Sequence, residues 1–525
     1  MGFVLSALSL LLAPAAARFG RSLDRPAAAQ ARLQRRLVAQ VTASDYGRAH
    51  GVRQVADWER LPVVTYDDLR PWLAQQRAEG RSLLTREPVL FYERTSGSSG
   101  PAKEIPYTRS LRRAFNHLFC VWAFDLLRHG PRFSSGKFYF CISPKLQEAD
   151  PDPQGLQDDS EYLDPWLRWL LRPFWVLPEA AHRPQSVAQF KRQLAIALLA
   201  EERLEILSLW SPSFLSAQLD YIQAHQHELR RALAGTLSPE RDRLLAAPEI
   251  AWNRLWPHLR LISCWDSATA ADSAEGLRRL FPGALVQGKG LLATEAPMTV
   301  PLIAAQGCVP LVDTVLFEFE DEAGKIWQIQ EIQPGIVYEL IISQSGGLYR
   351  YRMGDRVRVT HVYRSTPCLE FLGRSRDTSD LVGEKLTVAF VAQVLADLDL
   401  APARFACLAP VLTPRPHYAL LLDLAPDSEA IAQRLEAALG RSPQYRHARL
   451  LGQLGPVAVA AAADMAERLS VARAQNSTRW GDVKHSALLT QPFGTLEGLL
   501  LGTNLSPNPD ETVQTCVQTS GKDPS

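Results

Sequence analysis

The stretch that most constrains the fold is residues 95–103, where small and hydroxyl-bearing side chains follow an apolar run. Residues 88–92 are apolar and aromatic, which is typical of a buried strand. Residues 111–127 carry apolar side chains on a helical period and predict a helix. We therefore expect a loop that joins a strand to a helix.

This loop has the chemistry of a polyphosphate site. Its glycines let a bulky anion approach the backbone N–H groups, while hydroxyls add donors and Lys103 adds a mobile positive charge. A flexible Gly/Ser linker is the alternative, but a linker seldom runs through Pro-Ala-Lys into an apolar helix. The predicted phosphate-binding residues are Thr95, Ser96, Gly97, Ser98, Ser99, Gly100 and Lys103.

The loop differs from the common P-loop, in which lysine directly follows the last glycine and a Ser or Thr then binds the metal. Here Lys103 comes three residues after Gly100, and Glu104 follows it. The metal ligand must therefore come from elsewhere in the chain.

Strand-like and helix-like segments alternate through the next part of the chain. Residues 138–142, 204–210 and 259–265 read as strands, and residues 187–199, 212–234 and 274–280 as helices. This alternation predicts an α/β domain with largely parallel sheets, whose ligands bind at the carboxyl ends of the strands. Residues 265–267, at one such end, are therefore candidates for the site.

Two further segments carry acids at useful positions. In residues 286–295, glycines including Gly290 open a turn that Thr294 and Glu295 close, and Glu295 is able to supply oxygen to Mg²⁺. Its alternative role is a helix cap or a surface acid. Asp355 ends a predicted strand over residues 347–355, with the charge to accept both ribose hydroxyls. Residues 311–342 alternate apolar and polar side chains, which predicts an antiparallel sheet or barrel.

At 525 residues the chain exceeds one domain by the usual size prior. After Asp377 the composition shifts towards Ala and Leu, and helices alternate with a strand. We expect an N-terminal domain over 1–376, a separate α+β domain over 377–502 and a disordered tail over 503–525.

Composition argues against several classes of protein and of binding site. The net charge of +1 argues against a nucleic-acid binder, and seven scattered cysteines without a C-x-x-C pair argue against zinc or disulfides. A reducing cytoplasm is the simplest setting. The apolar residues 3–17 are too short to span a bilayer, so we expect a packing helix. Faint signal-peptide and myristoylation patterns keep membrane association as the alternative.

Taken together, three motifs resemble the adenylate-forming superfamily of acyl-CoA synthetases, peptide-synthetase adenylation domains and luciferases. They are the loop 95–103, the segment 293–295, and residues 351–355 followed by 373–377. Residues 46–51, 61–66 and 105–108 further resemble the Gretchen Hagen (auxin-responsive promoter) family of acyl acid amido synthetases, in its bacterial form. The resemblance covers roughly residues 30–495.

The resemblance implies a fold: a large N-terminal adenylate-forming domain with parallel sheets and a β-barrel-like subdomain, and a small mobile C-terminal domain. It implies ATP and Mg²⁺ as cofactors, with the loop on the phosphates, Thr294 and Glu295 at the α-phosphate and metal, and Asp355 on the ribose. Arg374 assists at the ribose or phosphate, and Gly290 and Leu291 belong to the nucleotide site. Leu291 departs from the superfamily, where an aromatic residue often stacks on adenine.

The resemblance also implies a catalytic lysine from the C-terminal domain, which we place at Lys484 with Lys385 as the alternative. Lys103, in the loop, is a further predicted catalytic residue. The implied reaction activates a carboxylic acid as acyl-AMP and passes it to an amine, usually an amino acid. An acyl-CoA or acyl-AMP synthetase, and a nucleotide-binding scaffold without turnover, remain alternatives. We expect a monomer with small-molecule partners only.

Overall fold

The computed structural model describes residues 2–94, 103–140, 169, 171–176, 187–267, 270–374 and, with short gaps, 378–498. The chain divides into two compact units. The first takes in residues up to Thr378 together with Ala474–Ser486, and the second takes in Ser379–Arg473 and the residues from Ala487 onward.

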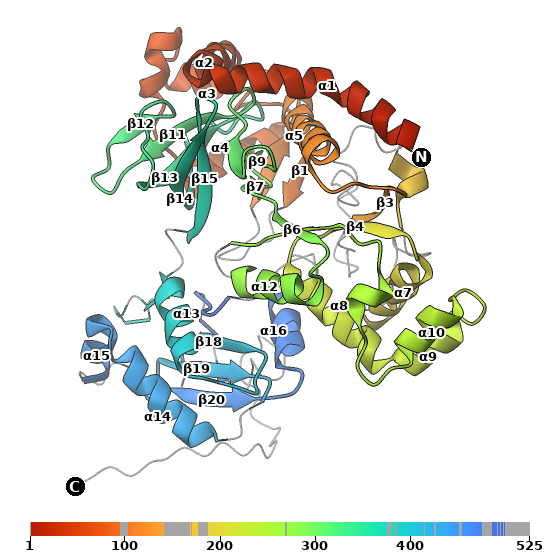
Figure 1. Cartoon of the computed structure of the whole chain (residues 1–525). Coiled ribbons are helices and arrows are strands. Elements are labelled where there is room, and N and C mark those ends of the chain that lie inside the picture. Colours follow the sequence, from red (N-terminus) through yellow and green to blue (C-terminus); the bar gives the residue numbers. More distant parts are fainter. Residues whose placement is uncertain are drawn as a thin grey trace. The chain divides into compact units, whose positions relative to one another are not determined.

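The first unit opens with helices (Figure 1). Helix α1 packs along α5, and α2 buries the stripe Leu33, Leu37 and Val41 at helical spacing. None of the helices that the structure describes combines the length and apolar character needed to cross a bilayer. The elements are α1 (Gly2–Asp24), α2 (Pro26–Thr42), α3 (Asp45–Ala49), η1 (Val55–Arg60), α4 (Tyr66–Glu79) and α5 (Arg109–His129).

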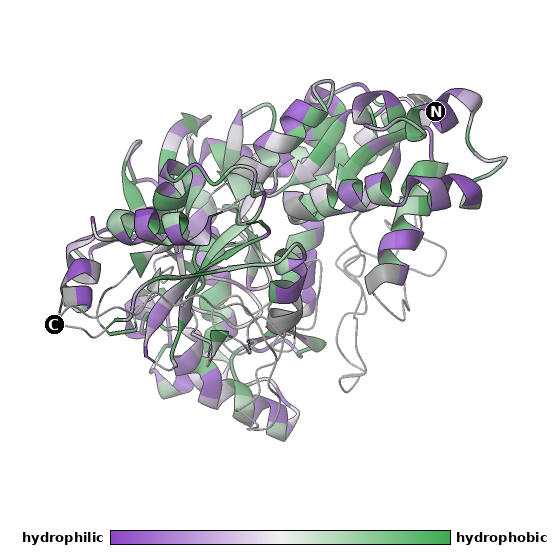
Figure 2. Cartoon of the chain, turned by 90° about the horizontal axis from the view of Figure 1, so that it is seen from below, coloured by the Kyte–Doolittle hydropathy of each residue, from purple (hydrophilic) through white to green (hydrophobic). Residues whose placement is uncertain are grey.

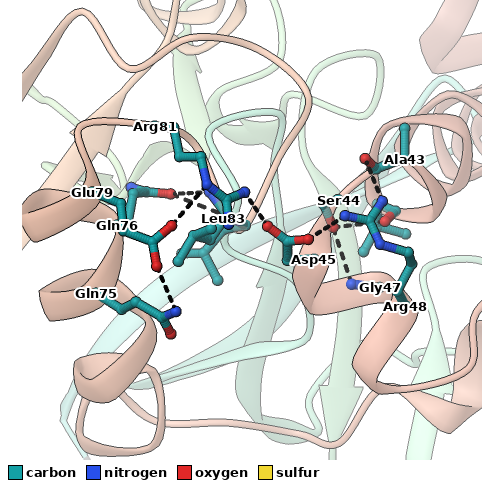
Figure 3. A network of polar contacts seen from close by, with 12 residues as sticks. Ala43, Ser44, Asp45, Gly47, Arg48, Gln75, Gln76, Glu79, Arg81 and Leu83 are labelled. Carbon is teal, nitrogen blue, oxygen red and sulfur yellow. Dashed lines mark hydrogen bonds and ion pairs between the residues drawn. The ribbon is translucent and has the colours of Figure 1, made fainter.

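A polar network joins α3 to the end of α4 and the residues that follow it (Figure 3). Asp45 pairs with both Arg48 and Arg81, and the hydrogen bond from Arg81 holds the pKa of the Asp45 carboxyl below its usual range. The buried Gln76 accepts from the Leu83 backbone N–H at 2.8 Å. It also donates to the hydroxyl of Tyr92 at 3.0 Å. The network therefore fixes the strand from which residues 95–102 depart.

The loop lies between two antiparallel strands, so it does not join a strand directly to a helix as the sequence predicted. Strand β1 (Phe91–Arg94) pairs with β2 (Glu104–Tyr107), and α5 begins only afterwards. The reason is local: Ile105 and Tyr107 alternate into the core, and the Thr108 hydroxyl accepts from Leu111 N at 3.3 Å as an N-cap.

The predicted parallel sheet is confirmed. Four parallel strands pair in chain order, and helices connect successive strands. The strands are β3 (Lys137–Phe140), β4 (Leu204–Ser208), β5 (Leu261–Cys264) and β6 (Leu285–Gly288). The accompanying helices are η3 (Arg172–Phe174), α7 (Val187–Ala200), α8 (Pro212–Ala224), α9 (Gln226–Ala232), α10 (Pro239–Leu245), α11 (Trp252–Leu255) and α12 (Ala271–Leu280).

The antiparallel sheet predicted over 311–342 is also present and extends beyond that range. Its strand order is β12-β11-β13-β14-β15, and two short hairpins, β7-β8 and β9-β10, precede it in sequence. The strands are β7 (Leu292–Ala293), β8 (Ala296–Pro297), β9 (Thr299–Leu302), β10 (Gly307–Pro310), β11 (Leu316–Glu320), β12 (Ile326–Gln328), β13 (Val337–Ser343), β14 (Tyr351–Tyr363) and β15 (Thr366–Arg374).

The second unit is a small α+β fold. Its strands alternate side chains between two cores: Leu408 and Leu420 face one, and Cys407 and Leu421 face the other. Strands β18 and β19 pair antiparallel and β19 and β20 parallel. The elements from the division onward are β16 (Thr378–Ser379), β17 (Leu386–Thr387), α13 (Val388–Asp397), β18 (Ala406–Val411), β19 (His417–Leu422), α14 (Ser428–Leu439), α15 (Pro443–Leu450), β20 (Ala458–Ala461) and α16 (Met465–Ala474).

The hydropathy of each element follows its burial. Figure 2 shows many helices banded in purple and green, as expected where one face packs and the other meets water. In the first unit, one core lies under α2, α5 and the antiparallel sheet, and another lies around the parallel sheet.

Candidate active site

Two of the predicted motifs meet through one hydrogen bond. Strand β2 leaves the loop and places Tyr107 beside the turn of the β7-β8 hairpin, where its hydroxyl donates to the carbonyl of Thr294 at 2.8 Å. The phosphate-loop hairpin and the Thr294–Glu295 turn are therefore neighbours in one unit, although 187 residues separate the bonded pair.

Glu295 lies in this turn with a buried side chain, and its backbone carbonyl accepts from the Gln344 amide at 3.1 Å. The described residues offer its carboxylate neither a hydrogen-bond donor nor a cationic partner. A buried carboxylate without a partner is costly, so this oxygen donor fits a role as a cation ligand.

The surroundings limit what kind of metal site this is. Across the described part of the chain, no three His, Cys, Asp or Glu side chains gather to hold a metal ion. A single carboxylate suits Mg²⁺, which takes one or two protein carboxylates and completes its shell with phosphates and water.

Lys103 is directed towards the third motif. Its Nζ donates to the Tyr351 hydroxyl at 3.2 Å and lies 5.7 Å from the Tyr66 ring centroid and 5.8 Å from that of Tyr351. Both rings favour a cation at this distance. A parallel backbone bridge between Val64 and Tyr351 brings the segment before α4 beside the start of β14, and the Tyr66 hydroxyl also accepts from the Glu104 N–H at 2.8 Å. The end of the loop is thus held against the start of β14.

Asp355 is the fifth residue of β14, which continues to Tyr363, so the strand does not end at the acid as the sequence predicted. Asp355 shares the buried face of the strand with Tyr351 and Met353 and lies opposite Arg374 in the register with β15. Gly354 adopts φ +76° and the register shifts after Arg356, which marks an irregular backbone at this acid.

Gly290 and Leu291 precede the turn. Gly290 has φ +66°, and a Cβ there would collide with the hydroxyl of Thr299, which already accepts from Leu291 N at 2.7 Å. Only glycine suits this conformation. The Leu291 side chain packs in the core of the antiparallel region, and its role beside adenine stays a prediction.

The remaining predicted residues are beyond what the structure describes. Thr95, Ser96, Gly97, Ser98, Ser99 and Gly100 fall outside the described residues, as do Lys385 and Lys484, and Arg374 is placed by its backbone alone. Their roles stay predictions.

Sequence reasoning did not assign a role to Lys289. Its Nζ donates to Ser208 Oγ at 2.9 Å and to Ser263 Oγ at 3.3 Å, and it lies over the ring of Trp210. Both serines are at or near the carboxyl ends of parallel strands, where ligands of such sheets bind. This shared position is the sequence signal that could have identified the neighbourhood of Lys289.

Asp266, within the candidate segment 265–267, also lies at this edge. Its carboxylate is packed against Gly288 and pairs with Arg278 at 3.4 Å, and burial raises the pKa of its carboxyl.

Comparison with known proteins decides the family. The sequence profile of the GH3 family N-terminal domain matches residues 15–286, that of the central domain residues 308–374, and that of the C-terminal domain residues 386–492. The chain belongs to the GH3 family. The sequence-based assignment to this family is confirmed.

Individual GH3 relatives are distant. A rice protein, "Probable indole-3-acetic acid-amido synthetase GH3.2", is 24% identical over 407 residues, which cover 66% of each chain. Alignments with three such curated relatives cover 60% to 66% of those proteins' lengths.

Solved structures establish the fold. "AtGH3.15 acyl acid amido synthetase in complex with 2,4-DB" superposes with a TM-score of 0.76 at 18% identity, covering 94% of this chain and 95% of that one. A "2-Hydroxyisobutyryl-CoA Ligase" in a postadenylation state superposes at 0.53 with 14% identity, covering 91% and 90%. The predicted adenylate-forming fold is therefore confirmed.

Proposed function

We propose that this GH3 protein is an ATP-dependent acyl acid amido synthetase. It activates a carboxylic acid as acyl-AMP and then forms an amide with an amine, for which an amino acid is the expected acceptor. The observation that carries the proposal is the Tyr107–Thr294 hydrogen bond, since it joins the hairpin that carries the phosphate loop to the turn of Glu295, a buried carboxylate to which the described residues offer no partner. The activities named for GH3 relatives support the same reaction.

The first step must overcome charge repulsion. A carboxylate oxygen attacks the α-phosphorus of ATP, the bond to the β-phosphate oxygen breaks, and pyrophosphate leaves. One ammonium at about 4 Å offsets about 4 kcal/mol of repulsion in a partly screened site. Lys103, held by the rings of Tyr66 and Tyr351, is placed at the loop to supply such a charge.

The second step moves the acyl group. The amine nitrogen attacks the acyl carbon, the carbon–oxygen bond to AMP breaks, and the nitrogen gives up a proton. In this proposal Asp355 and Arg374 hold the ribose and phosphate. The loop 95–100 holds the pyrophosphate that leaves in the first step. The catalytic lysine of the 377–502 domain is Lys484, or else Lys385.

Mg²⁺ fits the donor set at Glu295. When bound, it would neutralise phosphate charge during adenylate formation. The chain's own contribution is to hold the Glu295 backbone through Gln344 so that the carboxylate stays in the turn. We further propose that the protein acts as a cytoplasmic monomer on small molecules.

An acyl-CoA ligase is the second candidate, favoured by the likeness to the CoA ligase fold. To separate the two, purified protein, MgATP and a panel of acids are mixed with either amino acids or CoA, and AMP release is measured. We expect amide product with an amino acid. AMP release with CoA alone would overturn the amide assignment.

Glu295→Gln tests the site. We expect pyrophosphate exchange to fall at least about 100-fold, in the range seen when a buried electrostatic group is removed. Glu322→Gln is the matched control, since Glu322 is 89% exposed. Equal rates for the two variants would remove Glu295 from the mechanism, and no exchange with any acid in the wild type would favour a nucleotide-binding scaffold.

A further inference from the structure

The first unit contains an apolar cavity of about 460 Å³ beside the parallel sheet. One wall comes from the N-terminal half of α1, a second from α5, and a third from β3, β4 and the residues around η3. Representative lining residues are Leu8, Leu12, Phe119, Leu126, Phe138 and Phe174. Nearly the whole lining is aliphatic or aromatic.

One end of the cavity is polar. Ser208, at the carboxyl end of β4, is its one aliphatic hydroxyl among the described lining residues, and it accepts from Lys289 Nζ at 2.9 Å. The same ammonium lies 5.9 Å from the ring centroid of Phe140, which also lines the cavity. The indole N–H of Trp175, in the lining, is buried and has no acceptor among the described residues.

An apolar cavity with a cation at one end suits a ligand that is an amphipathic anion. Its volume indicates how large the apolar part is. A cavity of about 150 Å³ accepts benzene, so 460 Å³ accommodates roughly ten to eighteen carbons. A single aromatic ring would leave most of the cavity empty, and a polar acid would lose its hydration without gaining partners.

We propose that the cavity takes the hydrocarbon part of the acid substrate and that Lys289 pairs with its carboxylate. The substrate class is therefore monocarboxylic acids with a long or bulky aliphatic chain. This inference rests on the proposed function, because it assigns the acid that the ligase activates.

Chain length gives the first test. Straight-chain monocarboxylates from acetate to hexadecanoate are compared with benzoate in pyrophosphate exchange, and their binding without ATP is measured by calorimetry. Each methylene contributes about 0.8 kcal/mol when buried, so we expect the dissociation constant to fall about four-fold per methylene until the cavity is full. Ala123 lies on the α5 wall of the cavity, so the larger side chain of Ala123→Phe would fill part of it. We expect the chain length that gives the fastest exchange to become shorter in this variant.

Lys289→Met gives the second test. The wild type should bind dodecanoate at least about ten-fold more tightly than dodecanol, and the variant should lose that preference while binding dodecanol as before. Lys325→Met, at an exposed hairpin, is the control and should keep the preference. Circular dichroism shows whether each variant is folded.

The outcomes separate the two claims. Benzoate or acetate exceeding every long-chain acid in kcat/KM would overturn the substrate assignment and leave the ligase intact. An unchanged acid preference in folded Lys289→Met would overturn the role of that lysine. If long-chain acids bind in calorimetry but neither they nor any other acid supports exchange, the ligase function is overturned, and the substrate assignment with it.

Discussion

Glu205 offers the sharpest test of how the parallel sheet is held. This carboxylate on β4 is 2% exposed and accepts four hydrogen bonds from the segment before β3. Oε1 accepts from Ser134 N at 2.7 Å and Ser134 Oγ at 2.6 Å, and Oε2 accepts from Ser135 N at 3.0 Å and Gly136 N at 2.7 Å. Gly136 also lines the apolar cavity, so this contact shapes the cavity wall.

The variant Glu205→Gln keeps the side-chain size and removes the charge. The amide nitrogen is best placed at Oε1, where the Ser134 hydroxyl turns to accept but the Ser134 N–H is left unpaired. An unsatisfied buried N–H costs about 1–3 kcal/mol, and two remaining bonds each weaken by about 0.5–1.5 kcal/mol on losing the charge. The expected loss therefore lies between about 2 and 6 kcal/mol.

Hydrogen exchange measured by mass spectrometry on residues 130–140 reports the stability lost in this segment. A local measurement is needed because a chain with two units need not unfold in one two-state transition. A loss of 3 kcal/mol corresponds to exchange about 100-fold faster. Glu240→Gln is the matched control, because that acid is 71% exposed and lies 3.9 Å from Arg254.

The pH dependence follows from the same contacts. Burial alone would raise the pKa of the Glu205 carboxyl, but the hydrogen bonds from Ser134, Gly136 and Ser135 outweigh it and lower the pKa. The stabilisation is therefore complete above the ordinary value of 4.5 and is lost as pH falls through the lower folded pKa. Protection in Glu205→Gln equal to wild type at pH 7 would refute this reasoning.

Three further predictions concern the site and its support. Glu318→Gln should lower the free energy of unfolding of the first unit by about 3–5 kcal/mol in urea titrations, because it leaves the buried Arg350, now 3.0 Å from Glu318, without a negatively charged partner; a loss under 1 kcal/mol would contradict this. Gly290→Ala should cost at least about 1–2 kcal/mol in the same assay, since its positive φ and the Thr299 hydroxyl exclude a Cβ; unchanged stability would contradict it. Tyr107→Phe should slow pyrophosphate exchange about five-fold, for one hydrogen bond of about 1 kcal/mol, and a wild-type rate would show that this bond does not position the turn.

The sequence predicted the elements whose cause is local. Apolar periodicity located α5 and α7, and the alternation of strands and helices indicated the parallel sheet. Small residues with hydroxyls and a lysine indicated phosphate chemistry at 95–103, and the order of three motifs indicated the adenylate-forming fold, which the structural likeness confirms.

Where the local sequence signal was weak, the predicted ends of the elements differ from those in the structure. The four residues of β2 are too few for a period to register, so the sequence predicted a loop that leads straight into a helix. The sequence predicted a strand that ends at Asp355, yet pairing with β15 carries β14 on to Tyr363. In both places cross-strand hydrogen bonds, which one sequence does not display, outweigh local preference.

By itself the sequence therefore determined the family and the order of the motifs, and it predicted the reactive groups, because these depend on residue type and spacing. Only the tertiary structure decided which groups meet: Tyr107 with Thr294, Lys103 with Tyr351, and Lys289 with Ser208 at the end of an apolar cavity. These contacts join residues 81 to 248 positions apart, and they form because burying the strands and helices that carry them brings their ends to one place.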